Sequence, residues 1–452
     1  MKLIKCLVII VLCIPVTCMA VEASCDHIQP ITIKGNQNIY RFVPKKTADT
    51  RILSEKKQKK YLTIFLQHFF SPWRKNGMQL LHKMFSDKNK RFEKDQLNNI
   101  AYYKQHLGFG ENYQKHTKEW LNSIVANMSM LNFPNTDKNA ITIDNTPMRY
   151  FPTIAPHFYN FKTVGQGYPF DNFQKSVILA GTPIHVYQVS KDGDWVFVES
   201  PALFGWVSVK NIAYVSDDFM QYWETENYVA TIAKKHSIKD VQGTFRFQAY
   251  MGSVFPLIKE NKNSYRIIVP AANASREAIV MEADVSKKYM QKMPLPSTPN
   301  NFAKLIKKLL GASYGWGGEY FYSDCSSTLK GLFAPFGIWL PRNSGAQANV
   351  GDKVDLSKLS ARRRRNYILK KGVPFTTLIH VPGHIMLYIG EEKGKVMTFQ
   401  NLWAFQTWAR RGSKYCEGRA VVGKALVMPL ELKYDRGMTP QIAVDKLDIS
   451  SL

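Results

Sequence analysis

The stretch YSDCSSTLKGLF, residues 322–333, places a cysteine at the predicted start of a helix. Ser323 can cap this helix, and apolar residues such as Leu329 and Leu332 recur behind it at helical spacing. The first amides of a helix lack internal partners, and the helix dipole favours negative charge there. We therefore expect the thiol of Cys325 to have a lowered pKa and to act as a nucleophile. An inert, buried thiol is the alternative.

A nucleophilic thiol needs a base, and a histidine lies in a suitable place further along the chain. His384 begins HIMLYIG, whose alternation is typical of a strand, and it can face a helix end packed on the sheet. A polar acceptor on the neighbouring strand must orient its ring, and TFQNLW offers Gln400 or Asn401. His380 is a second candidate base. The alternative for His384 is a histidine that only packs in the core, and the alternative for Gln400 is a strand residue that faces solvent.

The N-terminus has the pattern of an export signal. MKLIKC is a short basic start, and LVIIVLCIPV is an apolar run that is too short to span a membrane stably. We predict a signal peptide over residues 1–23 and an exported mature protein without a transmembrane segment, with the periplasm as its compartment. Lipid anchoring at Cys18 is an alternative. Cys25 and Cys416 can form one bridge, which would leave Cys325 unpaired.

The composition describes a folded, strongly basic chain. The 452 residues are 45% hydrophobic, and 61 Lys and Arg against 35 Asp and Glu give a net charge of +26. Such a charge suggests an anionic partner. The one dense basic run is Arg362 to Arg365, and no zinc-finger spacing, basic heptad or RNA-binding aromatic signature accompanies it. We therefore favour a basic surface near an anionic cell envelope over specific nucleic-acid binding.

The pattern of the chain changes along its length and indicates several domains. Helical periodicity gives way to short strands and turns, among them a Lys-Asp-Gly-Asp hairpin turn at 191–194. After a proline-rich linker, helices precede strands, which is an α+β pattern. The predicted parts are a helical segment (24–135), a small β-barrel (136–216), a second β unit (217–290), the linker (291–300) and the α+β domain (301–452).

Four stretches together resemble a known family. YGWGGEYFYSDCSSTLKGLFAPFGIWLPRNSGAQ (314–347), followed by PGHIMLYIG (382–390), resembles the NlpC/p60 cell-wall cysteine peptidases. HFFSPW (68–73) is similar to their helical stabilising segment, and residues 169–209 are similar to a bacterial SH3 domain. The resemblance implies a multidomain α+β protein with a helical N-terminal segment, two SH3-like barrels and a papain-like peptidase domain.

The resemblance also assigns roles to individual residues. It implies Cys325 as nucleophile, His384 as base and Gln400 as the third polar residue, where the family often has histidine. Tyr314 is expected to line the site.

The same resemblance implies three contacts to the substrate. Asp324 would bind the ammonium of a free N-terminal L-alanine, although a carboxylate there can also cap the helix. Ser326 and Ser344 would hydrogen-bond the peptide.

The implied activity is cleavage of the γ-D-glutamyl–diamino acid bond in peptidoglycan stem peptides or muropeptide fragments, without a metal or other cofactor. Two alternatives remain open. One is a cell-wall binding protein with an inactive peptidase domain, and the other is an amidase acting on the sugar–peptide bond.

Overall fold

The computed structural model of the chain describes residues 28–33, 35–74, 88–411 and 414–431, and the short strands β1 (Leu12–Cys13), β2 (Val16–Thr17) and β23 (Lys446–Asp448). Side chains are described outside 408–416 and these three short strands. The predicted signal peptide therefore lies outside the residues whose side chains are described. The same holds for Cys25 and Cys416, which are predicted to form a bridge.

Helices dominate the N-terminal part, as predicted. They are η1 (Ile39–Phe42), α1 (Glu55–Phe69), η2 (Ser71–Trp73), α3 (Lys88–Gln105), α4 (Lys118–Asn127) and η3 (Met130–Asn132). The Ser54 side chain caps α1 by accepting a hydrogen bond from the backbone N–H of Lys57, and Pro72 lies just beyond the end of α1. The indole N–H of Trp73 donates to the carbonyl of Ala140 at 2.8 Å. This bond ties the helical segment to the first barrel.

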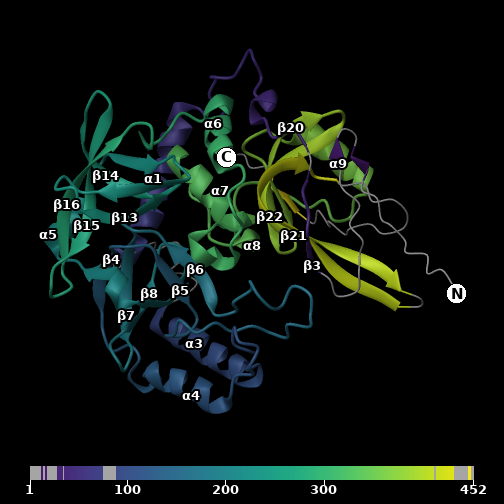
Figure 1. The fold of residues 1–452 in the computed structure, drawn as a ribbon. Coiled ribbons are helices and arrows are strands. Elements are labelled where there is room, and N and C mark those ends of the chain that lie inside the picture. Colours follow the sequence, from purple (N-terminus) through teal and green to yellow (C-terminus); the bar gives the residue numbers. More distant parts are fainter. Residues whose placement is uncertain are drawn as a thin grey trace.

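The first barrel is a seven-stranded sheet in the order β10-β4-β7-β8-β9-β5-β6. Its elements are β4 (Lys138–Thr142), β5 (Thr146–Arg149), β6 (Gln174–Ile178), β7 (Pro183–Val189), β8 (Trp195–Glu199), β9 (Phe204–Ser208), η4 (Val209–Asn211) and β10 (Ile212–Tyr214). Gly193 takes a φ of 81° in the predicted turn between β7 and β8. Helix α3 packs on the barrel through Phe92, which contacts the rings of Phe197 and Phe204. Figure 1 shows α3 and α4 beside this barrel.

The second barrel follows directly. Its five-stranded sheet has the order β16-β15-β14-β11-β17, and β12 and β13 form a separate hairpin. Phe247 and Phe255 stack in its core, next to the buried Trp223. The elements are α5 (Asp217–Trp223), β11 (Tyr228–Thr231), β12 (Lys235–Lys239), β13 (Phe245–Tyr250), β14 (Val254–Glu260), β15 (Ser264–Ala272), β16 (Ala278–Ser286) and β17 (Met290–Lys292).

The C-terminal domain packs helices on both faces of a sheet with the order β18-β23-β19-β20-β21-β22-β3. Its helices are α6 (Pro299–Leu309), η5 (Trp316–Phe321), α7 (Cys325–Phe333), η6 (Ala334–Phe336), α8 (Ser344–Gln347) and α9 (Ala361–Lys371). Its strands are β18 (Lys353–Val354), β19 (Leu378–Val381), β20 (His384–Glu392), β21 (Lys395–Arg411), β22 (Lys414–Pro429), β23 and β3 (Ile28–Pro30). The pairing is antiparallel except for β3, which runs parallel to β22. Figure 1 shows α6 and α7 between the two barrels and this sheet.

Helix α7 lies very close to the second barrel. A Cβ on Gly331 would lie 2.7 Å from the carbonyl oxygen of Met251, and a Cβ on Gly252 would lie 2.8 Å from the Cα of Gly331. Only a residue without a side chain allows this approach of two backbones. The helix that begins at Cys325 is therefore fixed on one side by its own sheet and on the other by the second barrel.

The architecture agrees with the predicted fold class: a helical N-terminal region, two SH3-like barrels and an α+β peptidase fold. Within the described ranges, no helix has both the length and the apolar character needed to cross a bilayer.

Candidate active site

Cys325 is the first residue of α7, and its side chain is buried with 6% exposure. The helix start is held by a capping box: the Asp324 side chain accepts from the N–H of Ser327, and the Ser327 hydroxyl accepts from the N–H of Asp324. The backbone N–H groups of Ile385 and Ser326 are bonded to the thiol. Because Ile385 follows His384 in β20, these contacts bring the predicted nucleophile to the strand that carries the predicted base.

The His384 ring is oriented by Gln400. Its Nε2 lies 2.7 Å from the Gln400 Oε1 on β21. The other end of this amide donates to the Thr398 hydroxyl at 3.0 Å, and that hydroxyl donates to the carbonyl of Met428. Since the amide nitrogen faces an acceptor, its oxygen must face the ring, and Nε2 carries the proton. Nδ1 then keeps a lone pair and can act as a base.

The pKa of the thiol shifts in the direction opposite to the sequence-based expectation. Burial, followed by the charge of Asp324, raises the pKa of Cys325 to about 12. Burial lowers the pKa of His384 to about 4, although the hydrogen bond to Gln400 opposes this shift. The expectation of a lowered thiol pKa was wrong because burial and an adjacent carboxylate outweigh the helix dipole. Near neutral pH both partners are therefore uncharged.

Asp324 and Ser326 are engaged within the protein. Arg342 binds both carboxylate oxygens of Asp324: its Nη2 donates to Oδ2 at 2.6 Å, and its Nη1 donates to Oδ1 at 3.1 Å. Burial raises the pKa of Asp324, but the Arg342 charge and several hydrogen bonds outweigh it and leave that pKa below its usual value. The Ser326 hydroxyl donates to Asp324 and accepts from Arg342 at 3.0 Å. The structure therefore brings Asp324 beside Cys325 mainly as a helix cap and ion-pair partner.

The other predicted residues, Tyr314, Ser344 and His380, lie on three other segments of the C-terminal domain. Tyr314 forms an isolated backbone bridge with Ser323, two residues before Cys325. Burial, followed by the charges of Cys325 and Asp324, raises the pKa of its phenol. Ser344 is half-buried at the start of α8, where Asn343 provides the cap. His380 lies in β19, opposite Ile385.

Asn401, the other amide considered as the orienting residue, bonds elsewhere. Its side-chain nitrogen donates to the carbonyl of Ser323 at 2.6 Å and to the hydroxyl of Thr328 at 3.0 Å. It therefore fastens α7 to β21, and Gln400 is the amide that contacts His384.

Sequence reasoning missed Arg342 and Thr398. Arg342 is 7% exposed and joins the nucleophile helix to the first barrel through its Nε and the Ser176 hydroxyl at 2.6 Å. A signal was present, because a lone arginine in the mostly apolar stretch GIWLPRNSG needs a carboxylate if it is buried. Nothing in the sequence around Thr398 indicated its role, because its hydrogen bond to Met428 depends on the register of β21 and β22.

The arrangement is suited to acyl transfer. It combines a thiol, an oriented neutral imidazole and the backbone N–H of Cys325 at a helix N-terminus, which can stabilise an oxyanion. Within the described ranges, no group of three or more His, Cys, Asp or Glu side chains is arranged to hold a metal ion.

Comparison with protein families gives matches along most of the chain. The NLPC_P60 stabilising domain matches residues 3–133, and an SH3 domain of the SH3b1 type matches 156–208. An SH3 domain of the SH3b2 type matches 216–262, and the NlpC/P60 family matches 311–398. The order of these matches is the order that the sequence predicted.

Three individual proteins are similar to this chain. A γ-D-glutamyl-L-lysine dipeptidyl-peptidase of Bacillus cereus is 24% identical over 216 residues, which are 45% of this chain and 61% of that protein. The structure of an NlpC/P60 endopeptidase of Photobacterium damselae subsp. piscicida is 28% identical, with a TM-score of 0.79 over 89% of this chain and 92% of that one. An NlpC/P60 family protein of Bacillus cereus is 19% identical, with a TM-score of 0.46 over 68% of this chain and 97% of its own.

Proposed function

Because the chain belongs to the NlpC/P60 family of cysteine peptidases, we propose that it hydrolyses the γ-D-glutamyl–diamino acid bond of peptidoglycan stem peptides or muropeptide fragments. The observation that carries the proposal is the hydrogen bond of His384 to Gln400, beside a cysteine at the start of α7. The name of the Bacillus cereus relative, a γ-D-glutamyl-L-lysine dipeptidyl-peptidase, supports the choice of bond.

The proposed reaction begins from the uncharged pair. The Cys325 sulfur attacks the γ-glutamyl carbonyl while its proton moves to Nδ1 of His384. The backbone N–H of Cys325 donates to the oxyanion that forms. His384 then gives its proton to the leaving amine, and it later accepts a proton from the water that hydrolyses the thioester.

Substrate contacts follow from the groups that remain available near the thiol. Oδ2 of Asp324 accepts a described hydrogen bond only from Arg342, so it retains a lone pair for the ammonium of an N-terminal L-alanine. Because Arg342 compensates its charge, this contact is weaker than one from an unpaired carboxylate. Tyr314 and Ser344 are proposed to line the peptide, whereas Ser326 is proposed to act through Asp324 and Arg342.

The test is digestion of the tripeptide L-Ala-γ-D-Glu-diaminopimelate, followed by mass spectrometry. The wild type should release L-Ala-D-Glu and free diaminopimelate, and Cys325→Ala should release neither. Equal cleavage by both proteins, or no cleavage by the wild type in reducing buffer, would reject the proposal. Release of an intact stem peptide from a muropeptide would instead indicate an amidase.

The compartment is part of the same proposal. A peptidase of the cell wall must meet its substrate outside the cytoplasm, and the basic start followed by an apolar run supports export, with the periplasm as the destination. Fractionation of cells that express the full chain checks this placement.

A further inference from the structure

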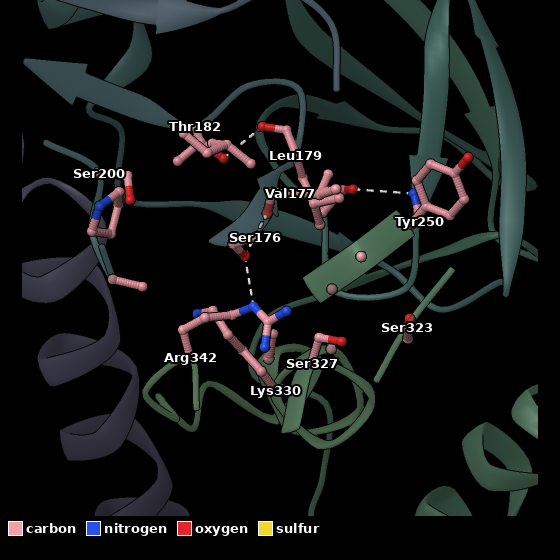
Figure 2. A pocket seen from close by; sticks show the side chains of 18 of the residues that line it. Ser176, Val177, Leu179, Thr182, Ser200, Tyr250, Ser323, Ser327, Lys330 and Arg342 are labelled. Atoms are coloured by element: carbon pink, nitrogen blue, oxygen red, sulfur yellow. Dashed lines mark hydrogen bonds between the residues drawn. The ribbon is translucent and has the colours of Figure 1, made fainter. Parts of the chain in front are cut away.

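A cavity of about 160 Å³ lies behind the nucleophile helix, on the side away from His384. Helix α7 contributes Ser327, Lys330 and Gly331 to its wall, and Ser323 lies just before the helix, whereas Cys325 is not among the lining residues. The remaining wall includes β6 and the 200–203 loop of the first barrel, the 250–254 turn of the second barrel, helix α1 and part of η5. Figure 2 shows side chains of β6, of α7 and of loops from both barrels around the cavity.

Lys330 brings a cationic amine to this cavity. Its Nζ lies 3.7 Å from the centre of the Trp339 ring, and His68 stacks on the same indole with 5.0 Å between ring centres. Among the residues that the structure describes, none forms a hydrogen bond or an ion pair with Nζ. An ammonium group carries three donors, so a single ring contact leaves it poorly satisfied.

The charges around Lys330 do not balance. The neighbouring Arg342 is neutralised by Asp324 at 2.6 Å, and its Nε donates to Ser176. No carboxylate is left for Lys330 among the lining residues. Burial, followed by the charge of Arg342, lowers the pKa of Lys330 to about 7. The cavity thus has one positive charge without a counter-charge.

The rest of the wall is largely apolar. Phe65, Phe69, Val177, Met251 and Trp339 all line the cavity. An apolar cavity of roughly 150 Å³ is large enough for a molecule of the size of benzene. The site therefore presents an apolar volume that matches one small ring or short alkyl chain, with a cation at its edge.

We propose that this cavity binds a small aromatic or aliphatic monocarboxylate, with the carboxylate at Nζ of Lys330 and the apolar body between Phe69, Val177 and Met251. The carboxylate supplies the missing counter-charge, and the apolar body fills the void. The site lies outside the group formed by Cys325, His384 and Gln400, although Ser327 and Arg342, which bind Asp324, also line the cavity. The proposal does not depend on the proposed peptidase activity.

A ligand at this place would touch four parts of the chain at once: α1, both barrels and α7. Ser323 and Ser327 lie on either side of Cys325 in sequence, so the ligand would contact the helix start that carries the nucleophile. A ligand that binds only the folded state raises its stability by mass action. Benzoate should therefore raise the melting temperature of the protein.

The experiment is isothermal titration calorimetry of the full chain with benzoate at pH 6.5, with benzamide as the neutral probe of matched shape. We expect one benzoate to bind with a Kd of about 1 mM, as for other very small ligands. Lys330→Met keeps the length of the side chain and should weaken benzoate binding at least tenfold. Lys307→Met is the matched control, because Lys307 lies over the Tyr40 ring on the exposed face of α6.

Two further measurements keep the test decisive. Ala202→Phe adds a ring at a position that lines the cavity and leaves residue 330 as lysine, and it should also abolish benzoate binding. Melting curves and tripeptide cleavage confirm that each variant is folded. Absence of benzoate binding by the wild type, equal affinity for benzamide, or unchanged affinity in Lys330→Met would each overturn the proposal.

Discussion

The hydrogen bond between His384 and Gln400 offers the sharpest test of the catalytic arrangement. The change Gln400→Ala removes the acceptor at 2.7 Å from Nε2 and leaves the ring N–H of the half-buried His384 without that partner. Gln400 is 4% exposed and is fixed by Thr398, so a loop movement cannot replace it easily. The variant should therefore lose the orientation of the imidazole and keep the rest of the site.

The size of the effect follows from the cost of an unsatisfied buried donor. That cost is about 1–3 kcal/mol, which corresponds to a loss of roughly fivefold to 150-fold in kcat/KM if the transition state bears it in full. Because Gln400 faces His384 and the sheet, the loss should appear in kcat with little change in KM. Gln400→His supplies another ring nitrogen as acceptor and should recover part of the rate.

The assay is tripeptide cleavage followed by mass spectrometry over a range of substrate concentrations. Gln406→Ala is the control, since Gln406 is an exposed glutamine on the same strand that bonds Glu417. A kcat/KM for Gln400→Ala within twofold of the wild type would refute the orienting role. So would an equal loss in both variants, because it would reflect damage to β21 in general.

Three more outcomes are expected from the same structure. Gln400→Glu puts a negative charge beside the ring, which favours the protonated imidazole and raises the pKa of His384 from about 4, so the acidic limb of the kcat/KM profile should move to higher pH. Gly331→Ala should destabilise the fold by about 1–3 kcal/mol in urea unfolding, because its Cβ would lie 2.7 Å from the carbonyl oxygen of Met251, while Gly345→Ala should have little effect. Iodoacetamide should alkylate Cys325 slowly at pH 7 and faster only at strongly alkaline pH, since the thiol pKa is raised to about 12; rapid labelling at pH 7 would contradict the buried, uncharged thiol.

Local pattern was sufficient for most of the architecture. The helical stripe of α6, the Asp-Gly turn before β8 and the alternation in β20 are periodicities that neighbouring residues determine by themselves. The cysteine at the start of α7 and the histidine at the start of β20 were found in the same way. The resemblance of motifs in order then supplied the domain types.

The remaining features depend on contacts between distant segments. The choice between Gln400 and Asn401 required the register of β21, since adjacent strand residues face opposite sides. The pKa of Cys325 required its burial, and the role of Asp324 required Arg342, 18 positions away. A helix start recognised in the sequence shows that the helix dipole lowers the pKa of a thiol there. It does not show the burial of the thiol, which raises that pKa.

The resting state of the site constrains how the reaction can begin. With the thiol pKa at about 12 and the imidazole pKa at about 4, forming the ion pair costs on the order of 10 kcal/mol before the two charges attract each other. Burial of both groups therefore favours the uncharged pair as the starting point. From that pair, proton transfer to His384 accompanies bond formation between sulfur and carbon, so that the negative charge passes to the carbonyl oxygen. The amides at the start of α7 then stabilise charge in the transition state rather than in the free enzyme, which is where such stabilisation raises kcat.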